Sequence, residues 1–147
     1  MIRQGIATAA IAAAALLLPA TAHSQGNWQQ VVSSQISRAA GFFGERGYER
    51  THDIYNGSLA DHESESMTLN LHAGTTYALI GVCDQDCTDI DLRLYDSDGD
   101  EVDSDLKTDD KPIVQVAPHV TGEYRVKVTM ASCSTSPCFY GVGVYGK

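Results

Sequence analysis

Basic residues are scarce in this sequence. Ten Lys and Arg stand against 19 Asp and Glu, which gives a formal net charge of −9. A chain with this balance is repelled by phosphate backbones and by anionic lipid surfaces. Nucleic acid and membranes are therefore poor partners for the mature chain, and cations or cationic surfaces are favoured.

Long apolar runs are also missing, except at the start of the chain. One basic residue lies in Met1–Gln4, an uncharged Ala- and Leu-rich run follows from Gly5 to Leu18, and small residues lead to Ala22. This order is typical of a secretory signal peptide, and the run is too short to span a bilayer. We expect cleavage near Ala22, with Ser24 as the second choice and a retained anchor helix as the alternative. The mature protein is then secreted or periplasmic.

Cysteine is rare, and all four cysteines lie beyond residue 82. An even number in an oxidising compartment predicts two disulfides. We favour the local pairs Cys83–Cys87 and Cys133–Cys138, because short loops lose the least entropy on closure. Two cross-links between the loops are the alternative. A zinc site, to which the C-x3-C and C-x4-C spacings also point, is disfavoured by export.

Catalytic motifs are absent from the sequence. It contains neither H-E-x-x-H nor G-x-S-x-G. His52, His62 and His72 are ten residues apart, which matches no ligand spacing of a helix or a strand. We therefore expect no catalytic residues and no enzyme, and a small secreted hydrolase is the least favoured interpretation.

Helical periodicity appears near the start of the mature chain, over residues 27–40. Asn27 suits the N-cap of this helix and Gly41 its end. Glycine is frequent over residues 41–47, which predicts a hinge. We expect Trp28 and the two phenylalanines of the hinge to pack against the main domain. The apolar stripe of the helix consists of Trp28, Val31, Val32, Ile36 and Ala39 or Ala40.

Beyond Tyr48 the apolar period changes to two, as in strands with one buried face. Tyr124, Val126 and Val128 show it most clearly. Short strands with turn residues between them predict an all-β fold, an antiparallel, jelly-roll-like β-sandwich of about eight strands. The candidate strands are 54–59, 66–71, 76–82, 90–95, 101–103, 113–117, 124–130 and 139–145. The expected parts of the chain are the signal peptide (1–22), the helix and hinge (23–47) and the β-sandwich domain (48–147).

Several segments, taken in order, resemble the bacterial pre-peptidase C-terminal domain over roughly residues 50–147. They are "GTTYALIGV", "TDIDLRLYDSDGDEV", "KPIVQVAP", "TGEYRVKV" and "YGVGVYG". This resemblance implies a β-sandwich of the kind appended to secreted proteases and other exported enzymes. We expect a free-standing module here, because no protease domain precedes it. The resemblance implies a supporting or binding role, and calcium, matrix or polysaccharide binding occurs in some members of the family.

Acidic residues are concentrated in residues 83–110, with twelve Asp and Glu against two basic residues. An EF-hand loop starting at Asp96 would need glycine at its sixth position and glutamate at its twelfth. The sequence has Glu101 and Lys107 there, so this motif is excluded. The dipeptide Asp98-Gly99 instead predicts a type I′ hairpin turn.

Antiparallel strands would bring the loops 83–89, 104–111 and 131–138 to one end of the sandwich. Their carboxylates would repel one another unless a hard cation such as Ca²⁺, with about six to eight oxygen ligands, joined them. Asp89 and Asp91 are the favoured pair, because alternate residues of a strand share a face. A solvated acidic rim is the alternative. The candidate calcium ligands are Asp84, Asp86, Asp89, Asp91, Asp105, Asp109 and Asp110.

Together these features predict a secreted, non-catalytic, monomeric binding or accessory module, stabilised by Ca²⁺, whose partner is an extracellular polysaccharide or a secreted protein. An accessory or inhibitor-like partner of a secreted protease is the alternative, with the helix and hinge as its contact. Exposed aromatic rings would favour a polysaccharide, and Tyr95 and Tyr140 are weak candidates for that role.

Overall fold

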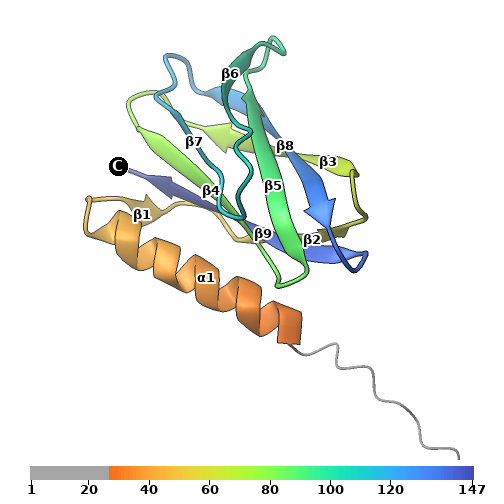
Figure 1. Ribbon diagram of the computed structural model, residues 1–147. Helices are drawn as coiled ribbons and strands as arrows, with labels where there is room; N and C mark the ends of the chain where they lie inside the picture. Colours follow the sequence, from red (N-terminus) through yellow and green to blue (C-terminus); the bar gives the residue numbers. More distant parts are fainter. Residues whose placement is uncertain (1–26) are drawn as a thin grey trace, which may run out of the picture.

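The computed structural model describes residues 27–147, which form one helix followed by nine strands in two antiparallel sheets (Figure 1). The predicted signal peptide lies outside the described residues. The first sheet has the order β1 (Glu49–Arg50), β9 (Cys138–Gly146), β4 (Tyr77–Cys83) and β7 (Ile113–Val116), and β2 (Tyr55–Leu59) also pairs with β9. The second sheet has the order β3 (Ser64–Leu71), β8 (Gly122–Cys133), β5 (Cys87–Tyr95) and β6 (Glu101–Asp105). The predicted all-β sandwich is confirmed.

The main core lies between the two sheets. Every second side chain of β5 points into it, so that Ile90, Leu92 and Leu94 are fully buried. On the neighbouring strand β8, Val126 and Val128 are fully buried as predicted. Because apolar and polar residues alternate with the period of the pleat, each of these strands presents one face to the core.

A second core lies between the helix α1 (Asn27–Gly44) and the outer face of the first sheet (Figure 1). The Phe43 ring stacks on Tyr145 with 4.8 Å between the ring centres. The Tyr145 hydroxyl donates a hydrogen bond to the Ile36 carbonyl oxygen at 3.3 Å. The helix is therefore packed on the sandwich. The buried helix residues are Val32, Ile36, Ala39 and Phe43, and they face Ala78, Ile80, Val82 and Tyr145.

The helix is longer than the sequence predicted. It continues through Gly41 to Gly44, so the predicted end at Gly41 is wrong, and a turn over residues 45–47 connects the helix to β1. Phe43 follows Ala39 by four residues and extends the buried stripe. Burial of an aromatic side chain outweighs the roughly 1 kcal/mol that glycine costs inside a helix. Among residues 27–147, no helix has the length and apolar character that crossing a bilayer requires.

The strand β1 was not predicted. It consists of two exposed charged residues, Glu49 and Arg50, and therefore shows no apolar alternation. It forms because its backbone pairs with the end of β9, where Glu49 lies opposite Gly146 and Arg50 opposite Tyr145. Only the position of β9 creates this strand. The other eight strands lie within a few residues of their predicted bounds.

The turn between β5 and β6 is not the predicted type I′ turn. That turn needs a positive φ at both central residues, and only Gly99 has one, at 89°. The Asp96 amide donates to the Asp100 carbonyl and the Gly99 amide to the Asp96 carbonyl, at 3.0 and 3.1 Å. The loop therefore has three residues with glycine in the left-handed position. The Asp96 carboxylate fixes it by accepting the Asp98 and Asp100 amides, both at 3.0 Å.

Candidate functional site

Four loops meet at one end of the sandwich. Backbone hydrogen bonds join three of them, from the Asp84 amide to the Phe139 carbonyl (2.9 Å), from Ser134 to Asp86 (2.8 Å) and from Ile90 to Asp109 (3.0 Å). The loops expected to lie together therefore do so. We call this region the disulfide end and define it as residues 60–63, 84–89, 105–112 and 133–138.

The loop 60–63 also belongs to the disulfide end, which the sequence analysis missed. The Asp61 carboxylate accepts the Cys133 amide at 2.7 Å, and the His62 amide donates to the Met130 carbonyl at 2.8 Å. Strand counting would have found this loop, because in an antiparallel arrangement every second connection lies at the same end.

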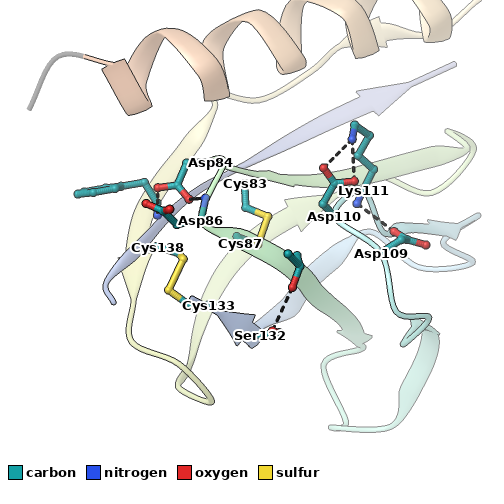
Figure 2. Close-up of a disulfide and its surroundings, with 12 residues drawn as sticks. Cys83, Asp84, Asp86, Cys87, Asp109, Asp110, Lys111, Ser132, Cys133 and Cys138 are labelled. Atoms are coloured by element: carbon teal, nitrogen blue, oxygen red, sulfur yellow. Dashed lines mark hydrogen bonds and ion pairs between the residues drawn. A yellow bond between two sulfur atoms is a disulfide. The ribbon is translucent and has the colours of Figure 1, made fainter. Parts of the chain in front are cut away.

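Both disulfides link neighbours in the sequence, as the sequence favoured. Cys83 is joined to Cys87 and Cys133 to Cys138, each with 5.9 Å between the Cα atoms. Cys87 lies opposite Cys133 in the β5–β8 pairing, so the two bridges are close together (Figure 2). Each bridge closes a loop of the disulfide end and limits how far that loop can move.

Asp84 is a buried carboxylate, only 6% exposed. One of its oxygens accepts the Asp86 amide at 3.2 Å and the other accepts the Phe139 amide at 2.9 Å (Figure 2). Charge-assisted bonds to backbone amides compensate a carboxylate for its burial. Asp84 therefore joins the 84–86 loop to β9, whereas Asp86 is exposed.

Two further acidic residues protect an edge of the first sheet. The Asp105 carboxylate accepts the Ile113 amide at 3.1 Å, and the Asp103 carboxylate accepts the Gln115 amide at 2.7 Å. Both amides belong to the edge strand β7, which pairs only with β4 among the described strands. Partial burial alone would raise the pKa of Asp105, but the amide bonds from Ile113 and Lys107 outweigh it and hold the pKa below its usual value.

Asp89 and Asp91 lie on the outward face of β5, on either side of the buried Ile90. One Asp89 oxygen is buried without a hydrogen-bond partner among the described residues. Partial burial raises the pKa of Asp91, and the neighbouring Asp89 charge adds to the shift. Asp105 and Asp109 also raise it, while Arg93 lowers it. These carboxylates therefore repel one another in the native state.

Within residues 27–147, no three His, Cys, Asp or Glu side chains converge closely enough to hold a metal ion. The acidic loops meet, but their carboxylates contact separate partners and do not converge on one point. Asp109 accepts the Lys111 amide at 2.9 Å, and the Lys111 ammonium contacts both Asp110 oxygens at 2.7 Å (Figure 2). Calcium binding stays a prediction, and it would require Asp89 or Asp91 to recruit a further ligand.

The two tyrosines expected as weak glycan contacts differ in exposure. Tyr95 is partly exposed, and the Arg125 guanidinium lies 4.7 Å from its ring centre. Tyr140 is fully buried, so the expectation that it contacts a glycan is wrong. Its hydroxyl donates to the Glu65 carboxylate inside the sandwich. Burial and that hydrogen bond raise the pKa of Tyr140 far above its usual value.

An aromatic pair lies beside the disulfide end, and it confirms the expectation that Trp28 packs against the main domain. Trp28 of the helix stacks on Phe139 of β9, with 3.9 Å between ring centres and 9° between ring planes. Trp28 also lines a cleft of about 250 Å³ together with the polar side chains Gln29, Ser33 and Asn56. Helical phase placed Trp28 on the inward stripe, but only the folded chain shows which strand it meets.

One cavity brings together a histidine and a serine. His52 and Ser66 line one cavity of about 450 Å³, but both ring nitrogens of His52 have other partners. One lies 2.8 Å from the Thr51 hydroxyl and the other 3.1 Å from the Asn70 carbonyl oxygen. A general base needs a nitrogen directed at its nucleophile, and neither nitrogen of His52 is hydrogen-bonded to Ser66.

No protein-family model and no curated protein sequence matches the chain. Among solved structures, it is similar to PliG from Aeromonas hydrophila, a periplasmic inhibitor of g-type lysozyme. The TM-score is 0.49 at 14% identity, over 65% of this chain and 85% of that one. It is also similar to the pre-peptidase C-terminal domain of a Bacillus anthracis collagenase. That TM-score is 0.48 at 14% identity, over 63% and 87% of the two chains. The second structure belongs to the family that the sequence resembles, and both matches concern the fold.

Proposed function

We propose that the mature chain is an exported, non-catalytic binding module whose disulfide end docks on a cationic surface of a secreted protein. The charge of this end is the observation that carries the proposal. Its four loops contain eight carboxylates and two lysines. Such a concentration of one sign raises the association rate with an oppositely charged partner and repels acidic ones.

The disulfide end is also held in one shape. Two disulfides close two of its loops, and the buried Asp84 ties one of those loops to β9. Asp61 ties the 60–63 loop to Cys133. A surface that is ordered before binding loses little conformational entropy in the complex. This rigidity supports a docking role for the loops, because solubility alone would require only exposed charge.

Neutralising charge at each end of the sandwich in turn tests the proposal. The docking variant combines Asp86→Asn, Asp109→Asn and Asp110→Asn, which keep the side-chain shapes. The matched control combines Asp98→Asn, Asp100→Asn and Glu123→Gln, three exposed residues away from the disulfide end. Both variants change the net charge equally, and the docking variant also removes the contacts of Asp109 and Asp110 with Lys111.

Binding of the mature chain is measured by surface plasmon resonance against a panel of purified cationic secreted proteins that includes a g-type lysozyme. We expect the docking variant to lose affinity by about tenfold or more, which corresponds to about 1.4 kcal/mol, and the control to lose much less. The association rate should fall with added salt. Equal losses in the two variants, or no binding to any member of the panel, would contradict the proposal.

A polysaccharide partner is the second candidate, favoured by the Trp28 cleft. An aromatic ring beside Gln29, Ser33 and Asn56 combines an apolar surface with hydrogen-bonding groups. Trp28 is the single tryptophan of the chain, so its fluorescence reports binding directly. Titration with soluble chito-oligosaccharides should shift that emission saturably, and Asn56→Ala should weaken the effect. An unchanged emission spectrum would count against this candidate.

A further inference from the structure

An apolar groove runs between the second half of the helix and the edge strand β7. Its volume is about 270 Å³. Ile80 and Val82 of β4 line it, together with Ala39 of the helix and Ile113 of β7. The helix packs on β9 and β4, so the space next to β7 is left open. This groove shares Lys111 with the disulfide end, and none of its lining residues lines the Trp28 cleft.

Phe42 forms an exposed wall of this groove. It is 47% exposed, although its neighbour Phe43 is buried in the second core. The Arg46 guanidinium lies 3.5 Å from the centre of the Phe42 ring. Phe42 is therefore held beside the groove by a cation in the turn that follows the helix, with apolar surface still accessible to a ligand.

The rim of the groove carries two basic side chains. Arg38 of the helix and Lys111, just before β7, line it from two sides. Among the described residues the Arg38 guanidinium donates one hydrogen bond, to the Ser34 hydroxyl at 3.5 Å. Lys111 is paired with Asp110 but remains about half exposed. On a chain with a net charge of −9, two cations beside an apolar groove complement a ligand with an apolar body and an anionic head.

The volume of the groove limits the size of its ligand. Pockets for drug-sized molecules begin at about 300 Å³, so a groove of 270 Å³ fits a single short apolar chain. We propose that the groove binds a small amphipathic anion, an alkyl carboxylate whose chain lies on Ile80 and Val82 and whose head group lies between Arg38 and Lys111. The chain gains from leaving water, and the head group gains from the two cations.

Octanoate is the probe, titrated into the ¹⁵N-labelled mature chain below its micelle concentration. We expect saturable chemical-shift changes at the amides around the groove. Octylammonium, which has the same chain and the opposite charge, should bind at least tenfold more weakly. Comparable binding of the two probes, or shift changes spread over the whole surface, would overturn the proposal.

Variants separate the head-group contact from the chain contact. Arg38→Gln with Lys111→Gln should weaken octanoate binding by about tenfold. The matched pair Arg125→Gln with Lys127→Gln, on the other sheet, should not. Asp110→Asn frees Lys111 from its partner and should tighten binding. If the two paired variants have the same effect, the head group does not lie where we propose.

Filling the groove tests the position of the chain. Ala39→Trp should occupy the groove and abolish octanoate binding. Ala39 is only 8% exposed, so Ile113→Trp, from the opposite wall and partly exposed, provides a second variant if the first does not fold. Octanoate binding of unchanged affinity in a folded groove-filled variant would overturn the proposal.

Discussion

Phe42 and Phe43 are adjacent identical residues in opposite environments, and they provide a matched test of how the helix contributes to stability. Phe43 is 3% exposed and stacks on Tyr145, whereas Phe42 is 47% exposed. Replacing a buried phenylalanine with alanine typically costs about 3–5 kcal/mol. Phe42→Ala loses partial burial and a cation–π contact with Arg46 worth about 0.5–1 kcal/mol. We therefore expect Phe43→Ala to destabilise the chain by about 2–4 kcal/mol more than Phe42→Ala.

Urea unfolding followed by two signals measures this difference. Trp28 fluorescence reports docking of the helix, because Trp28 stacks on Phe139 of β9. Far-UV circular dichroism reports the sheets and the helix together. If the helix and the sandwich unfold as one unit, both signals change together. In thermal unfolding, at roughly 4 °C per kcal/mol, Phe43→Ala then lowers Tm by about 10–20 °C. A variant in which only the fluorescence transition shifts would refute unfolding as a single unit. Equal losses of stability from Phe42→Ala and Phe43→Ala would refute the assignment of their environments.

Three further predictions concern the acidic residues and the interior of the sandwich. Asp91 has a raised pKa in the native state, so the folded chain binds a proton more readily than the unfolded chain. The ionised Asp91 side chain therefore destabilises the native state at neutral pH, and this destabilisation fades as pH falls through the native pKa. Asp91→Asn should raise Tm at pH 7, and the gain should shrink near pH 4; a pH-independent change would exclude this cause. If calcium binds beside Asp89, Ca²⁺ should raise Tm more than Mg²⁺ or NaCl at matched ionic strength. Asp89→Asn should then remove the difference, and equal effects of all three salts would rule the ion out. A Cβ atom at Gly57 would lie 2.5 Å from the Glu65 carboxylate and 2.8 Å from the Tyr140 hydroxyl. Gly57→Ala should therefore destabilise by about 1–3 kcal/mol in thermal unfolding, whereas Gly74→Ala introduces no such clash and reports only the cost of a positive φ.

Local patterns in the sequence were sufficient to predict much of the sandwich. Alternation in β5 and β8 predicts strands because the pleat has a period of two residues. The local disulfides follow from short loop closure, and the meeting of the acidic loops follows from counting antiparallel strands. Each of these inferences uses residues that are close in the chain, or a rule that holds for every antiparallel sheet.

Tertiary structure decided the features that depend on distant partners. The helix extends to Gly44 because Phe43 meets Tyr145, about a hundred residues later in the sequence. Acidic side chains expected to share a cation instead accept amides, as Asp84 does from Phe139 and Asp105 from Ile113. A carboxylate looks the same in the sequence whether it meets an ion, an amide or water.

The same reason explains the surfaces that no pattern revealed. Tyr140 alternates like any strand residue, and only the fold places its hydroxyl against Glu65 in the interior. The groove beside β7 exists because the helix covers one part of a sheet and leaves another open, with Arg38 and Lys111 brought together from 73 positions apart in the chain. The period of a strand is a local property, whereas the contacts of its side chains depend on how whole elements pack.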